Sequence, residues 1–167
     1  MKARRRTVTI EFVPPDDGEV AARLAQVTEA GDGWINLLPG VPEDSPDLIP
    51  PTGLSALFGS RQPPVTMATL MPARPDRKDP EGLTVGLMHP TGAKAAARLA
   101  EAGVAVPDGW VVRQDHARRG LLLRCPVGTD GASVIEWCVR AGTELCRADL
   151  TGRWQAVVYL PAATPAP

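Results

Sequence analysis

Two stretches of the chain are similar to each other when one is shifted by 75 positions. This similarity is the sequence feature that most restricts the folds that the chain can adopt. The shift aligns residues 9–15 with 84–90, 21–25 with 96–100 and, after one inserted residue, 33–35 with 109–111. A looser third copy follows over residues 121–160. Every copy has the order strand, proline, helix, glycine, tryptophan and strand. Such a unit carries the chain over a helix between two strands, a connection that is right-handed in nearly all proteins.

The fold class expected from this order is α+β. Residues 83–160 give the order β-α-β-β-α-β, the ferredoxin-like split β-α-β arrangement in which two helices cover one face of an antiparallel sheet. This sheet would be extended by strands at 7–13, 34–38 and 65–73, and a further helix is expected at 18–30. The strands at 65–73 and 84–88 are expected to form a hairpin. Thr91 is the expected N-cap of a helix over 93–102. The alternative is a more parallel sheet with helices on both faces.

Length and charge restrict the class of protein. With 167 residues, the chain fits one domain over residues 1–160. The net charge of -1 argues against a nucleic-acid binder and against a membrane-surface binder. No run approaches the roughly 20 apolar residues of a membrane helix, and the first residues do not form a signal peptide. Three cysteines without C-x-x-C spacing predict buried, reduced thiols, so we expect a cytoplasmic protein.

A proline-rich arm interrupts the alternation of strands and helices. Residues 39–64 contain seven prolines, which exclude a central strand and a long helix. The arm also carries the residues that we predict to bind a partner, Leu48, Ile49, Leu54, Leu57 and Phe58. We expect an ordered arm with a short helix near 54–59, which either lies over the sheet of its own chain or contacts a partner. The proline-alanine tail at 161–167 is expected to be disordered.

One candidate ligand site is the segment that joins the strand at 84–88 to the following helix. A helix N-terminus offers unpaired N–H groups and the positive end of the helix dipole, so His89, Thr91 and Lys94 could hold a phosphate or a carboxylate. The segment lacks the G-x-x-x-x-G-K-[ST] pattern of a P-loop. The alternative is an ordinary helix cap followed by a solvated lysine.

A second candidate ligand site is the turn at 115–120. Asp115 can orient the imidazole of His116, and the guanidinium groups of Arg118 and Arg119 can bind an anion. Neighbouring residues on a strand point to opposite faces, however, which weakens the pairing of Asp115 with His116. The alternative is a charged hairpin turn that keeps one corner of the sheet solvated.

The functional expectation follows from the arm and from what the sequence lacks. It contains no nucleophile motif, no metal-ligand cluster and no dinucleotide-binding motif, so no cofactor is expected and an enzyme is disfavoured. Trp34, Trp110 and Trp154 occupy matching positions in the copies and are expected to pack rather than to bind a ligand. We expect a non-catalytic binding or assembly module that forms a homo-oligomer, preferably a dimer, through the arm and an exposed sheet surface. The alternative is a protein or enzyme that binds a small anionic ligand at the two candidate sites.

Overall fold

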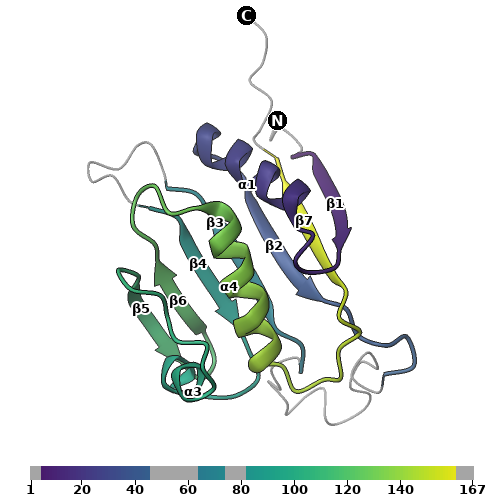
Figure 1. The fold of residues 1–167 in the computed structure, drawn as a ribbon, viewed down its shortest axis with the longest axis vertical. Coiled ribbons are helices and arrows are strands. Elements are labelled where there is room, and N and C mark those ends of the chain that lie inside the picture. The colour runs from purple at the N-terminus through teal and green to yellow at the C-terminus, as the bar shows by residue number, and fades with distance from the viewer. Residues whose placement is uncertain (1–4, 46–63, 74–81, 161–167) are drawn as a thin grey trace, which may run out of the picture.

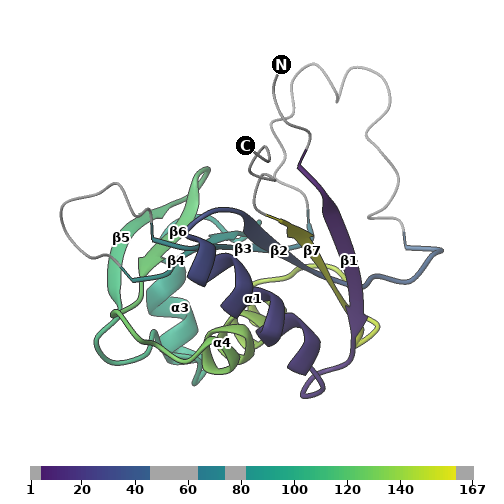
Figure 2. The same ribbon diagram turned by 90° about the horizontal axis from the view of Figure 1, so that it is seen from above.

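Seven strands form one antiparallel sheet, and the described helices lie on one of its faces (Figures 1 and 2). The computed structural model describes residues 5–45, 64–73 and 82–160. The elements in chain order are β1 (Thr7–Phe12), α1 (Gly18–Ala30), β2 (Trp34–Pro39), β3 (Met67–Met71), β4 (Thr84–Met88), α3 (Ala95–Glu101), β5 (Val111–His116), β6 (Gly120–Arg124), α4 (Gly131–Glu144) and β7 (Trp154–Tyr159). Every pair of neighbouring strands is antiparallel. The α+β prediction is therefore confirmed, and the parallel alternative is wrong.

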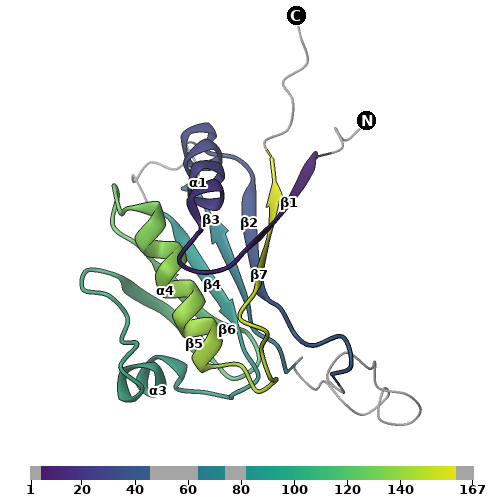
Figure 3. The ribbon, with the colours of Figure 1, turned by 45° about the vertical axis from the view of Figure 1, so that its right-hand side comes forward.

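The strand order is β1-β7-β2-β3-β4-β6-β5, which differs from a ferredoxin-like sheet. A ferredoxin-like arrangement of residues 83–160 would place β7 beside β4, and it is not confirmed because β2 and β3 lie between them. The predicted hairpin of β3 and β4 does form, and it occupies the edge of β4 that β7 would need. Instead, β7 lies between β1 and β2, as Figure 3 shows. In the other half of the sheet, β6 lies between β4 and β5.

The two stretches that are similar in sequence fall into matching elements. Residues 9–12 lie in β1 and 84–87 in β4, while 21–25 lie in α1 and 96–100 in α3. The helix α1 has its predicted bounds and ends at Gly31, whose left-handed φ of 60° suits a residue without a side chain. The helix α3 starts later than expected, at Ala95. Local sequence signals therefore set most elements, although not every boundary.

The hydrophobic core lies between the helices and the sheet face that they cover. Alternate strand residues point into it, namely Ile10, Phe12, Ile35, Leu37, Leu70, Val85, Leu87, Leu121, Leu123, Ala156 and Val158. The helix α4 contributes most of the helical side of this core, with six buried residues against three in α1. Cys125 and Cys138 are buried free thiols, as predicted, whereas Cys146 is partly exposed.

Several predictions concern segments outside the described residues. The five predicted partner-binding residues, the short helix near 54–59 and the tail at 161–167 all belong to these segments. Among the residues that are described, no helix combines the length and the apolar character needed to cross a bilayer.

Candidate functional site: the open face of the sheet

The second face of the sheet, which we call the open face, is not covered by any described helix (Figure 2). Along β2, β3, β4 and β7, residues that point toward the helices are buried, and the alternate residues that point to the second face are only half-buried. Many of these outward residues are apolar, although a solvated face of an antiparallel sheet normally carries polar ones. Together with Leu122 on β6, the apolar members form what we call the apolar patch: Trp34, Leu38, Met67, Met71, Met88, Leu122, Val157 and Tyr159.

An aromatic pair lies at one side of the apolar patch. Trp34 and Tyr159 face each other across β2 and β7, with ring centroids 4.4 Å apart and ring planes 15° apart. The guanidinium of Arg5 lies 5.2 Å from the centroid of the Trp34 ring and also donates to Asp32 at 2.7 Å. Stacking and cation–π contacts of this kind hold the two rings in place. The pair is therefore a pre-ordered part of the open face.

The centre of the apolar patch contains few polar groups, and two of them are hydrogen-bonded to each other. The hydroxyl of Thr69 donates to the side-chain oxygen of Asn36 at 2.9 Å, across β3 and β2. Gly86 in β4 lies between two patch residues, since a Cβ there would be in ordinary contact with Leu122 at 3.8 Å and Met71 at 4.0 Å. Covering this region would remove flexible apolar side chains from water without leaving the Thr69 hydroxyl unpaired. A partner that bound to the open face would therefore gain its affinity mainly from burial of apolar side chains.

The first predicted ligand site is largely engaged in contacts within the chain. His89 is 2% exposed, and its Nδ1 lies 3.0 Å from the hydroxyl oxygen of Thr91. The same hydroxyl oxygen accepts a hydrogen bond from Arg98 at 2.6 Å. Burial lowers the pKa of His89, the charge of Arg98 lowers it further, and Asp115 opposes these effects. Within the described part of the chain, Nε2 of His89 has no hydrogen-bond partner.

The start of α3 is occupied by a carboxylate from another strand. The backbone N–H groups of Ala95 and Ala96 donate to the two carboxylate oxygens of Asp115, each at 3.0 Å. Lys94 adopts the left-handed conformation at the N-cap position, with φ of 63°, and Thr91 does not cap the helix as predicted. The carboxylate of Asp115 thus binds the N–H groups at the start of α3, where the sequence predicted an external anion.

The second predicted site does not form as one cluster. Asp115 faces α3, whereas His116 lies at the exposed hairpin end, where its Nδ1 accepts the backbone N–H groups of Arg118 at 3.1 Å and Arg119 at 3.3 Å. The side chains of both arginines are exposed. These bonds are those of a hairpin turn. Asp115 therefore lies beside the first predicted site, whereas His116, Arg118 and Arg119 lie in the hairpin turn.

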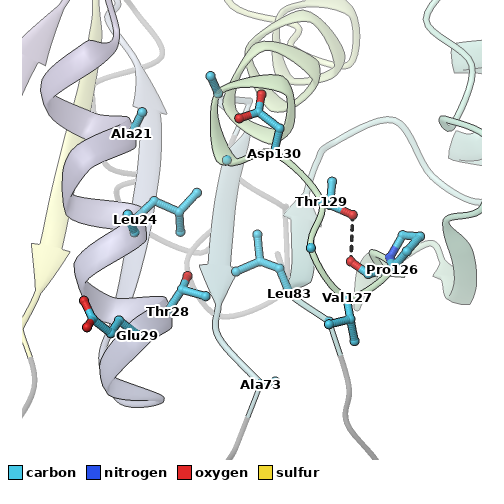
Figure 4. A pocket seen from close by; sticks show the side chains of 15 residues that line it. Ala21, Leu24, Thr28, Glu29, Ala73, Leu83, Pro126, Val127, Thr129 and Asp130 are labelled. Atoms are coloured by element: carbon cyan, nitrogen blue, oxygen red, sulfur yellow. Dashed lines mark hydrogen bonds between the residues drawn. The ribbon is translucent and has the colours of Figure 1, made fainter.

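A cavity of about 610 Å³ lies between α1 and the loop from β6 to α4 (Figure 4). Its lining is mainly apolar, with Leu24 projecting from α1. The carboxylate of Asp130 at the rim accepts the backbone N–H and the hydroxyl of Ser133, and these hydrogen bonds lower its pKa. Asp130 is therefore engaged as the N-cap of α4. The lining includes Ala73 and Gly82, which flank residues outside the description, so we assign no ligand to this cavity.

The open face is the main candidate for a functional site. The sequence matches no protein-family model, and comparison with curated proteins and with solved structures gives no significant match. No group of three or more His, Cys, Asp or Glu residues suited to a metal ion occurs in the described ranges. The sequence predicted contacts through an exposed sheet surface without naming its residues, although consecutive apolar residues such as 37–38 and 121–123 indicate strands with two apolar faces.

Proposed function

We propose that this protein is a non-catalytic cytoplasmic assembly module that associates with a second copy of itself through the open face of its sheet. The observation that supports this proposal is the apolar patch, which lies on a sheet face without a described helix above it. Large apolar residues that gather on one accessible face of a protein mark interaction sites. Two such faces can bury each other in a symmetric contact, because a twofold axis brings the same surface from both copies together.

The composition of the apolar patch fits a protein partner better than a small ligand. Tryptophan, tyrosine and methionine are enriched at protein interfaces, and this patch contains all three. Methionine side chains adapt to the surface that they meet, while the Trp34–Tyr159 stack provides a rigid anchor. A face-to-face contact between two sheets is a common packing arrangement, with the sheets about 10 Å apart. The expected result is a dimer with two stacked sheets.

The test compares oligomeric mass in a patch variant and in a matched control. In the double variant Met71→Glu with Leu122→Glu, two carboxylates in each copy would have to leave water on association, so we expect the open-face contact to be lost and the mass to fall below that of the wild type. In the control Ala22→Glu with Gln26→Glu, two carboxylates appear at exposed positions of α1, and the mass should equal that of the wild type. Sedimentation equilibrium across a wide concentration range measures both. A wild-type protein that stays monomeric at high concentration would refute the proposal.

The arm residues are part of the same proposal. Leu57 and Phe58 are two of the predicted partner-binding residues, and replacing both by glutamate tests whether the arm contributes to association. We expect the variant Leu57→Glu with Phe58→Glu to dissociate at a higher concentration than the wild type does. Equal dissociation in the two proteins would restrict the contact to the sheet.

The second candidate function is binding of a small anionic ligand near His89 and Lys94. The observation that favours it is the buried Nε2 of His89, which has no described partner. The observation against it is Asp115, which already accepts the N–H groups at the start of α3. A thermal-shift screen with phosphate, nucleotides and carboxylic acids separates the two functions, because a ligand at 100 times its dissociation constant adds about 2.7 kcal/mol to stability. No shift with any of these anions would eliminate the second candidate.

A further inference from the structure

The two edge strands of the sheet differ in how well they are protected. β5 has a bulge between Val112 and Gln114, and Arg113 at that position is exposed. A bulge and a charge are two devices that stop an edge strand from pairing with another chain. β1 pairs with β7 in an unbroken register from Thr7 to Phe12, contains neither a bulge nor a proline, and carries one charged residue, Glu11. Within the described part of the chain, no strand pairs with the outer side of β1 (Figure 1).

The hydrogen bonds of β1 show which backbone groups point outward. The backbone N–H of Leu160 donates to the carbonyl oxygen of Arg6 at 2.9 Å, so Arg6 and Leu160 are a hydrogen-bonded pair in this register. In an antiparallel ladder such pairs alternate with pairs that do not bond each other. The N–H and C=O groups of the even-numbered residues of β1 therefore point toward β7. Those of Thr7, Thr9 and Glu11 point away from the sheet.

These three outward residues form a self-complementary set. If two copies of β1 run antiparallel with Thr9 opposite its counterpart, Thr7 of each copy lies opposite Glu11 of the other. Each strand then offers three N–H donors and three C=O acceptors, which together close about six hydrogen bonds. We infer that β1 pairs with β1 of a second copy in this register and joins the two sheets into one continuous sheet.

The side chains on both faces fit this register. Thr7, Thr9 and Glu11 lie on the open face in both copies, while Val8 would lie opposite Ile10 on the face that the helices cover. No like charges become directly opposed, because Glu11 meets a threonine, and threonine pairs across strands are favourable. A twofold axis perpendicular to the sheet keeps all helices on the same side. The second copy is therefore the occupant that this edge matches.

This inference deepens the proposed self-association, but it places a contact at the edge of the sheet rather than on its open face. The two contacts use different residues, so they can be tested separately. Proline at position 9 removes an N–H group that points outward and leaves the hydrogen bonds from β1 to β7 intact. We expect Thr9→Pro to fold normally and to lose the edge contact, which lowers the mass of the assembly in sedimentation. Thr9→Val keeps the N–H group and should behave as the wild type.

Disulfide trapping tests the register directly. In a Cys146→Ser background, which removes the partly exposed thiol, Thr9→Cys places two thiols directly opposite each other with Cα atoms about 5.5 Å apart, within the range of a disulfide. Thr7→Cys places its two thiols four residues apart along the strands, roughly 13 Å, which is too far. Under mild oxidation we expect a covalent dimer from Thr9→Cys and none from Thr7→Cys.

The outcomes separate the edge contact from the open-face contact. Equal cross-linking of the two cysteine variants, or a mass unchanged by Thr9→Pro, would overturn the pairing of β1 even if the patch variant Met71→Glu with Leu122→Glu dissociates. Cross-linking that is specific for Thr9→Cys and persists in the patch variant would support the edge contact alone. If the wild type is monomeric and neither cysteine variant cross-links, both proposals fail.

Discussion

The contact of Asp115 with α3 gives the sharpest prediction for stability. α3 has only seven residues, too few to be stable alone, and its first N–H groups bond the carboxylate of a residue on β5. Asp115→Ala removes both acceptors and the favourable charge at the helix start. Loss of a helix cap costs about 0.5–2 kcal/mol, and hydrogen bonds to a charged group contribute about 1.5–3 kcal/mol. Because Asp115 is only half-buried and water can replace part of the contact, we expect a loss of about 2 kcal/mol.

Urea denaturation followed by tryptophan fluorescence measures this loss. For a chain of this size, it corresponds to a decrease in melting temperature of about 4–8 °C. Asp115→Asn keeps one oxygen acceptor and should lose about half as much. The control is Asp108→Ala, which removes the same charge from an exposed position before β5 and should change stability by less than about 0.5 kcal/mol. If Asp115→Ala and Asp108→Ala are equally stable, the carboxylate does not hold α3 in solution.

Two further predictions concern buried titratable groups. Because burial lowers the pKa of His89 in the folded protein, the unfolded chain takes up a proton first as the pH falls below about 6.5, so the free energy of unfolding should decrease between pH 7.5 and 5.5. His89→Gln should reduce this pH dependence in urea titrations, and an unchanged slope would contradict the assignment. Burial raises the pKa of Cys125 to about 12 and also raises that of Cys138, so a thiol reagent at pH 8 should label only Cys146 in the native protein and all three cysteines in urea. Rapid native labelling of more than one thiol would show that the core opens.

The elements that were predicted correctly carry local sequence signals. The helix α1 is bounded by Gly31, and its inward residues Val20, Leu24 and Val27 follow the helical period, so both its extent and its buried face could be predicted. The hairpin of β3 and β4 joins strands that are close in sequence, and their antiparallel pairing was also predicted. Such features depend on residues within one or two turns of each other.

Features that depend on distant contacts could not be predicted from local signals. The sequence offered Thr91 as the cap of α3, but Asp115, which is 20 positions from Ala95, occupies the N–H groups. Only the folded sheet brings β5 over the start of that helix. The residues of the apolar patch were not identified for a related reason, because β2 carries apolar residues on both faces and its sequence does not show which face the helices cover.

The position of β7 affects how the chain can fold as it is synthesised. β7 is the last strand of the sheet in sequence, yet its backbone groups bond β1 on one side and β2 on the other, more than 100 residues earlier. Contacts between such distant residues slow folding, since a long loop must close before they form. During translation the N-terminal half would leave the ribosome with a gap between its first two strands. Until residues 154–159 fill it, no other described strand pairs with β1, and its edges stay exposed to incorrect pairing.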